Sequence, residues 1–145
     1  MITIVTGLPG SGKSTWARRQ AAENAGYVLD ADEVLATISG AEVHAAQYPH
    51  SDFKALTAAF WDLAKKLDAQ WRHIYLIRTM PSDYELFRNA GGCRMVWVET
   101  RPELCRQRCA QRLVNRVDDW EELLTRRNEF LQNNGARLQM VSGEA

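Results

Sequence analysis

The chain of 145 residues has no net charge, few cysteines and no long apolar run. Its 18 basic residues balance 18 acidic ones, so any hold on nucleic acid must come from a local patch of charge. The cysteines Cys93, Cys105 and Cys109 are odd in number and lack the C-x-x-C spacing of zinc and redox motifs, which favours free thiols. We therefore expect a reducing, cytoplasmic location. We expect neither export nor a membrane span, because no leader-like segment and no apolar stretch of about 18 residues is found.

The remaining composition is that of an ordinary globular domain, with 46% hydrophobic and 25% charged residues. A chain of this length fits one domain with a packed core. We therefore predict one domain over residues 1–145.

Short apolar runs alternate with segments that suit helices. Continuous apolar runs are typical of strands buried on both faces, and parallel neighbours need crossover helices. The pattern predicts a mostly parallel, roughly five-stranded sheet flanked by helices. The expected strands are 2–6, 27–30, 74–77, 95–98 and 137–141, and the expected helices are 14–23, 31–38, about 53–67 with a cap at Ser51 or Asp52, 82–90, 102–114 and 120–133.

Residues 7–14, Gly-Leu-Pro-Gly-Ser-Gly-Lys-Ser, fit the phosphate-binding pattern G-x-x-x-x-G-K-[ST] between a predicted strand and a predicted helix. In this motif the glycines let backbone N–H groups surround phosphates, the lysine reaches the β and γ oxygens, and the following hydroxyl ligates Mg²⁺. The motif predicts a three-layer α/β P-loop fold that binds ATP and Mg²⁺. The predicted nucleotide-binding residues are Gly7, Gly10, Ser11, Gly12, Lys13, Ser14 and Thr15.

A P-loop alone is compatible with a kinase, a GTPase, a motor or a transporter subunit. The chain lacks the guanine-reading N-K-x-D segment of GTPases and the long sensor regions of motors. A small kinase is therefore the favoured interpretation.

Three segments resemble the compact P-loop kinases grouped around polynucleotide 5′-hydroxyl kinase and the zeta-toxin-like kinases, many of them from bacteriophages. They are the P-loop, residues 29–33 (Leu-Asp-Ala-Asp-Glu), and the arginine-rich residues 102–112. The resemblance implies that Asp32 accepts the proton of the attacking hydroxyl, and Asp30 would help Ser14 to hold Mg²⁺ through water. A capping role at a helix N-terminus is the alternative for both aspartates.

The resemblance also implies a lid over about residues 101–116. This segment holds five arginines against one acid, Glu103. Arg108 and Arg112 are four residues apart and would share a helix face, so both could stabilise the transferring phosphoryl group. Arg106 and Arg116 are weaker candidates. A solvated, charge-rich helix face is the alternative interpretation.

Two positions depart from the family pattern. Polynucleotide kinases carry an arginine shortly after the base aspartate, where this chain has Leu35. The third strand ends in Arg78, where P-loop enzymes commonly carry an acidic residue that helps the metal. We expect Arg78 to face phosphate instead.

The segment before the long helix should lie at the carboxyl edge of the sheet, where α/β folds bind ligands, and we expect it to contact the substrate. Its polar residues are His44, Gln47, Tyr48, His50 and Asp52. Tyr48, Trp61 and Trp71 could stack a base, although aromatic residues at helical spacing are more often core. No third ligand accompanies the histidines, so a zinc site is not expected.

The leading functional hypothesis is a kinase that transfers the γ-phosphate of ATP to a hydroxyl of nucleic acid, either a 5′ end or a hydroxymethylated base. The first alternative is a kinase of a free nucleoside, nucleotide or small metabolite, which the neutral surface and Leu35 favour. The second is an ATP-binding switch or interaction module with weak ATPase activity, suggested by the missing acidic residue at strand three. The expected catalytic residues are Lys13, Asp32, Arg108 and Arg112.

Overall fold

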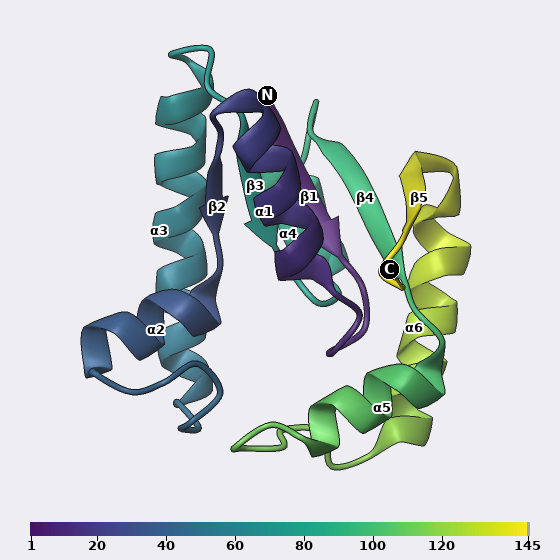
Figure 1. The fold of residues 1–145 in the computed structure, drawn as a ribbon. Helices are drawn as coiled ribbons and strands as arrows, with labels where there is room; N and C mark the ends of the chain where they lie inside the picture. The colour runs from purple at the N-terminus through teal and green to yellow at the C-terminus, as the bar shows by residue number, and fades with distance from the viewer. Residues whose placement is uncertain (145) are drawn as a thin grey trace.

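The computed structural model describes residues 1–144, and its centre is one sheet of five parallel strands (Figure 1). The strand order is β2-β3-β1-β4-β5. Parallel pairing is recorded for every neighbouring pair, for example Ile4 with Leu76 of β3 and with Met95 of β4. The strands are β1 Ile2–Thr6, β2 Tyr27–Leu29, β3 Ile74–Ile77, β4 Arg94–Glu99 and β5 Leu138–Ser142.

Helices cover both faces of this sheet, as a parallel sheet requires (Figure 1). The helix α1 packs on one face and α3, α4 and α6 pack on the other. The α-helices are α1 Lys13–Asn24, α2 Ala31–Ser39, α3 His50–Asp68, α4 Asp83–Asn89, α5 Pro102–Ala110 and α6 Trp120–Asn134, and a 3-10 turn, η1 Gly135–Arg137, precedes β5. Within residues 1–144, none of the helices has both the length and the apolar character needed to cross a bilayer.

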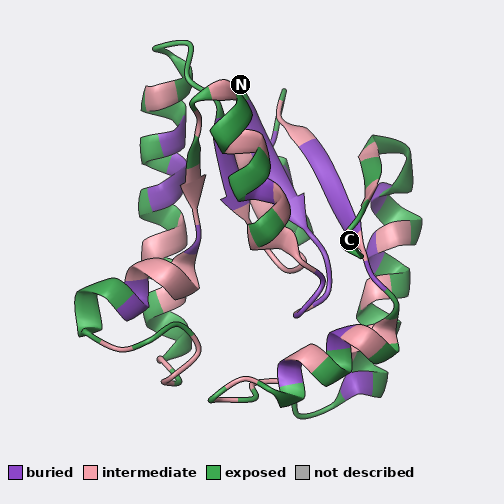
Figure 2. Cartoon of the chain, in the orientation of Figure 1, coloured by how far each residue is buried: buried purple, intermediate pink, exposed green. Residues whose placement is uncertain are grey.

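Alternate side chains of the central strands enter two different hydrophobic cores, because successive strand residues point to opposite faces. On β4, Met95 and Trp97 join the core under α3 and α6, whereas Val96 and Val98 join the core under α1. Figure 2 shows the central strands β1, β3 and β4 largely buried, whereas the outer faces of the helices and the edge strands β2 and β5 are more exposed. The continuous apolar runs of the three central strands therefore mark doubly covered strands, and the predicted parallel sheet is confirmed.

Two predicted helix boundaries are wrong. The third helix begins at His50 and its cap position is Pro49, before the expected Ser51 or Asp52. The fifth helix ends at Ala110 instead of continuing to about residue 114. In a longer helix the N–H of Val114 would donate to the carbonyl oxygen of Ala110. It donates instead to the carbonyl oxygen of His44 at 2.8 Å.

The strand order brings the ends of three strands together. β1 lies between β3 and β4. After β1 the chain enters α1 on one face of the sheet, whereas after β3 it enters α4 on the other face. Such switch points at the carboxyl edge of a parallel sheet are where α/β proteins bind ligands. The loop after β1 is the P-loop.

Candidate active site

The P-loop turns from β1 into α1 through glycines that other residues could not replace. Gly10 has φ of 79° and Gly12 has φ of 95°, both in the left-handed region. A Cβ at Gly10 would lie 2.7 Å from the carbonyl oxygen of Cys105 in α5. The turn is thus held both by its own backbone and by close contact with α5.

The loop borders a cavity of about 820 Å³ at the carboxyl edge of the sheet. Gly7 and Ser11 do not line it: Ser11 is buried, and a Cβ at Gly7 would lie 2.6 Å from its Oγ. These two residues shape the base of the loop. Of the predicted nucleotide-binding, metal-binding and catalytic residues, those that line the cavity are Gly10, Gly12, Lys13, Ser14, Thr15, Asp30, Asp32, Arg108 and Arg112.

Lys13 is the buried cation of this loop. Its Nζ donates to the carbonyl oxygens of Leu8 at 2.8 Å and Gly7 at 3.2 Å. Burial lowers the pKa of Lys13 to about 8, and the positive charge of Arg112 contributes to this lowering, while Asp30 opposes both. An anion that enters the loop therefore meets an ammonium group short of compensating charge.

Ser14 and Asp30 lie side by side. The Ser14 hydroxyl donates to Oδ2 of Asp30 at 2.7 Å, and Oδ1 of Asp30 accepts from the N–H of Asp32 at 3.1 Å. Asp30 therefore caps α2 and also faces the loop, so the two roles expected for it are compatible. A hydroxyl and a carboxylate are the oxygen donors that Mg²⁺ prefers, and phosphates and water would complete its shell. Among residues 1–144 no group of three or more His, Cys, Asp or Glu residues could hold a metal by itself.

Asp32 lines the cavity from the first turn of α2 and forms an ion pair with Arg116. The other terminal nitrogen of Arg116 donates to the carbonyl oxygen of Ala46. The guanidinium also lies 5.6 Å from the ring centre of Phe53 and 6.0 Å from that of Tyr48. The structure thus assigns a central position to Arg116, which the sequence marked only as a weaker candidate.

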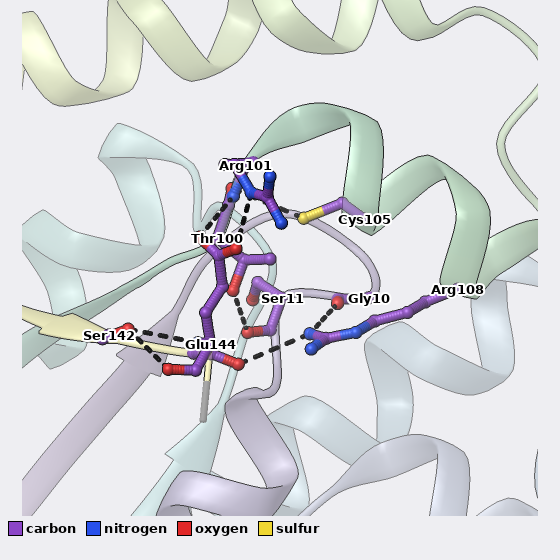
Figure 3. A network of polar contacts seen from close by, with 9 residues as sticks. Gly10, Ser11, Thr100, Arg101, Cys105, Arg108, Ser142 and Glu144 are labelled. Atoms are coloured by element: carbon purple, nitrogen blue, oxygen red, sulfur yellow. Dashed lines mark hydrogen bonds and ion pairs between the residues drawn. The ribbon is translucent and has the colours of Figure 1, made fainter.

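The two arginines expected to act together separate in the structure. α5 ends before Arg112, so Arg108 and Arg112 do not share a helix face. Arg108 donates to the carbonyl oxygen of Gly10 at 3.0 Å and to that of Gly143 at 3.5 Å (Figure 3). Arg112 lines the cavity close enough to Lys13 to affect its pKa. Arg108 thus binds the backbone of the P-loop, and of the two arginines Arg112 is the one whose charge lowers the pKa of Lys13.

The residues that follow β4 and β5 also pack against the P-loop, which the sequence did not indicate: a Cβ at Gly143 would collide with the carbonyl oxygen of Ser11. The N–H of Gly143 donates to the carbonyl oxygen of Glu99 at 2.7 Å, and Thr100 Oγ1 donates to the carbonyl oxygen of Ser11 at 2.7 Å. Glu144 accepts from Nε of Arg101 at 2.7 Å (Figure 3). The ends of β4 and β5 therefore fix the loop in place.

Of the segment expected to contact substrate, only His44 among its polar residues lines the cavity; Gln47, Tyr48, His50 and Asp52 do not. Burial, followed by the charge of Arg112, lowers the pKa of His44. Tyr48 instead shares a 2.7 Å hydrogen bond between its hydroxyl and that of Ser39.

Neither tryptophan proposed for stacking lines the cavity. Trp61 is a core residue, as the helical spacing suggested, and Trp71 is 92% exposed. Leu35 is buried in the core, so the position where polynucleotide kinases carry an arginine does not face the cavity.

The family comparison agrees with the motif. A family model described as an AAA domain matches residues 2–131 of the chain. No curated protein sequence resembles the chain at a significant level.

Solved structures share the fold over nearly the whole chain at low identity. A shikimate kinase from Aquifex aeolicus vf5 has a TM-score of 0.67 at 17% identity, covering 100% of this chain and 87% of that one. A deoxyadenosine kinase from M. mycoides has a TM-score of 0.60 at 14% identity, covering 100% and 91%. A gluconokinase from Sinorhizobium meliloti 1021 has a TM-score of 0.57 at 16% identity, covering 99% and 82%.

Proposed function

Because the chain belongs to the AAA-domain family and is a P-loop kinase by motif and fold, we propose that it transfers the γ-phosphate of ATP to a hydroxyl group of a small metabolite or nucleoside. The observation that carries the proposal is the cavity in which Lys13 and Ser14 of the P-loop face Asp32 of α2. Lys13 and Ser14 provide a binding site for phosphates, and Asp32 provides a carboxylate for the acceptor. We further propose that the chain acts as one kinase domain.

Mg²⁺ supplies charge compensation on the phosphates, and Ser14 with Asp30 would hold it. Lys13 and the amides of the P-loop bind the phosphate chain. Asp32 orients the acceptor hydroxyl and takes its proton as the oxygen attacks the γ-phosphorus. The bond from that phosphorus to the β–γ bridging oxygen breaks, and ADP leaves with the electron pair. Arg112 compensates the charge that spreads over the γ-phosphoryl oxygens.

The type of acceptor separates the two kinase hypotheses. The solved kinases with this fold carry the names of small acceptors, namely shikimate, gluconate and deoxyadenosine. At the position where polynucleotide kinases carry an arginine, this chain has Leu35, and Leu35 is buried. Both observations favour a small acceptor over nucleic acid. The narrower likeness to polynucleotide and bacteriophage kinases, and the cytoplasmic location, stay predictions.

The test is transfer of label from γ-labelled ATP to a panel of sugar acids, hydroxy acids, nucleosides, nucleotides and oligonucleotides. We expect label on small acceptors, with Asp32→Asn lowering transfer by about 10²–10⁴-fold while ATP affinity is kept. Exclusive labelling of DNA or RNA would restore the nucleic-acid hypothesis. Hydrolysis of ATP without any labelled acceptor would favour the switch or interaction module.

A further inference from the structure

Arg78 directly follows β3, at the position where a carboxylate is expected in P-loop enzymes. It continues the strand ladder, because its N–H donates to the carbonyl oxygen of Val5 at 2.9 Å. The next residue, Thr79, accepts from the N–H of Gly7 at 3.2 Å. Arg78 is therefore placed next to the P-loop, and it lines the same cavity as Lys13 and Asp32.

The guanidinium group of Arg78 is held from two helices. Nε and Nη2 donate to the two carboxylate oxygens of Glu85 in α4, at 2.9 and 2.6 Å. Nη1 donates to Oγ1 of Thr57 in α3 at 3.3 Å. Glu85 also accepts from the indole Nε1 of Trp61 at 3.0 Å. The orientation of the Arg78 group is thus fixed before any ligand enters.

This anchoring leaves part of the Arg78 guanidinium unused. An arginine has five N–H donors, and the contacts with Glu85 and Thr57 use three of them. Bidentate pairing through Nε and Nη2 occupies one edge, and Nη1 donates once to Thr57. One N–H of Nη2 and one N–H of Nη1 are therefore left without a partner among the described residues, and together they are called the free edge here. The Arg78 side chain is 30% exposed, whereas that of Glu85 is 13% exposed and does not line the cavity. The free edge of the cation is therefore the part available to a ligand.

The contribution of the Arg78–Glu85 ion pair to the stability of the fold does not by itself explain why the pair is present. An ion pair that is partly withdrawn from water, as this one is, contributes little net stability, because both charges lose part of their hydration. A fixed guanidinium edge at a cavity wall does match two oxygens of a carboxylate or a phosphate. Arg78 bonds to Thr57 of α3, and Phe53 of the same helix lines the cavity with it. The ring of Phe53 lies 5.6 Å from the guanidinium of Arg116, which pairs with the candidate base Asp32, so α3 joins the part of the cavity where the acceptor hydroxyl is proposed to bind.

We propose that Arg78 binds an anionic group of the acceptor, so that the substrate is an alcohol that also carries a carboxylate or a phosphate. This inference rests on the proposed kinase function and narrows its substrate class. The hydroxyl of such an acceptor lies at Asp32 while its anionic group contacts the free edge of Arg78. Glu85 and Trp61 are positioning residues for that contact.

The first test compares acceptors that keep the same primary or ring hydroxyl and differ in the anionic group: gluconate with gluconamide, shikimate with its methyl ester, and deoxyadenosine 3′-monophosphate with deoxyadenosine, which both carry a free 5′-hydroxyl. We expect the wild-type protein to favour the anionic member by at least about tenfold in kcat/KM, a tenfold change being about 1.4 kcal/mol. Which pair shows this preference distinguishes carboxylate from phosphate recognition. Equal use of both members would overturn the inference.

The variant for this test is Arg78→Met combined with Glu85→Gln, because removing the arginine alone would leave a buried unpaired carboxylate. The side-chain amide oxygen introduced by Glu85→Gln would still accept from Trp61. We expect the double variant to lose the preference for the anionic acceptor while the KM for ATP is kept. Arg94→Met is the matched control, since Arg94 contacts Gln139 and does not line the cavity. A preference that survives in the double variant would contradict the proposal.

A second measurement does not depend on catalysis. Protein saturated with a non-hydrolysable ATP analogue and Mg²⁺ is dialysed against labelled inorganic phosphate, so that the P-loop is already filled. We expect one additional phosphate site, at least tenfold weaker in the double variant. Absence of Arg78-dependent binding would overturn this inference, whereas phosphate binding without transfer to any acceptor would overturn the proposed function alone.

Discussion

At the scale of single residues, Lys13 shows how the fold changes the chemistry of a motif. Burial and the nearby charge of Arg112 lower its pKa to about 8 from an ordinary value of 10.5. The phosphates of a nucleotide favour the charged amine and would raise the pKa again in the complex. Nucleotide binding is therefore linked to protonation of Lys13.

We predict that ATP binding takes up protons above about pH 8 and takes up almost none near pH ~6.5, where Lys13 already carries its proton. The affinity for ATP should accordingly fall as the pH rises through this value. Calorimetry at about pH 9 in two buffers of different ionisation enthalpy measures the uptake directly. Lys13→Met should remove it and Lys54→Met, an exposed lysine of α3, should not; equal uptake in all three proteins would contradict the linkage.

At the scale of elements, the segment after α5 bridges the cavity to the connection between α2 and α3. Val114 donates to His44, and Arg116 contacts both Asp32 and Ala46. Tyr48 and Phe53 lie against the same guanidinium. Because the candidate base is part of this bridge, acceptor binding and the position of the segment must be coupled.

We predict that Arg116→Met loosens this bridge and weakens acceptor binding. A hydrogen bond to a charged group contributes about 1.5–3 kcal/mol, so the amide of Val114 should exchange its hydrogen at least about tenfold faster. Hydrogen exchange followed by mass spectrometry or NMR measures the rate, and initial-rate kinetics should show a raised KM for the acceptor. Arg106→Met is the control, since Arg106 is exposed on α5. An unchanged exchange rate at Val114 would show that the bridge does not depend on Arg116.

At the scale of the whole molecule, the last described residues link the sheet edge to the P-loop. A Cβ at Gly143 would collide with the carbonyl oxygen of Ser11 and with Oγ1 of Thr100. Both neighbours are buried and belong to distant parts of the chain. The site and the stability of the fold therefore depend on the same contact.

We predict that Gly143→Ala lowers the free energy of unfolding by about 1–3 kcal/mol through overpacking and weakens ATP binding because the P-loop must shift. Urea denaturation and calorimetry measure the two effects. Gly91→Ala is the matched control, because no atom lies within 4 Å of a Cβ at that position. A Gly143→Ala protein as stable as the control would show that the C-terminal contact is easily rearranged.

Local pattern was sufficient for the sheet and for the phosphate-binding loop. Apolar runs mark the strands, of which β1, β3 and β4 are buried on both faces, and the glycine positions of residues 7–14 are dictated by the turn itself. Both are properties of consecutive residues, so they can be predicted without knowing the fold.

Tertiary structure alone decided which arginines face the cavity. Arg116 meets Asp32 across 84 positions, and Arg78 is oriented by Thr57 and Glu85 from two helices. The helical spacing of Arg108 and Arg112 was misleading because α5 ends at Ala110, where a hydrogen bond from Val114 to His44 diverts the chain. The sequence by itself thus determined the P-loop, because that loop is formed by consecutive residues. The side chains around Asp32 and Arg78 were decided by packing, because their direction depends on contacts between distant segments.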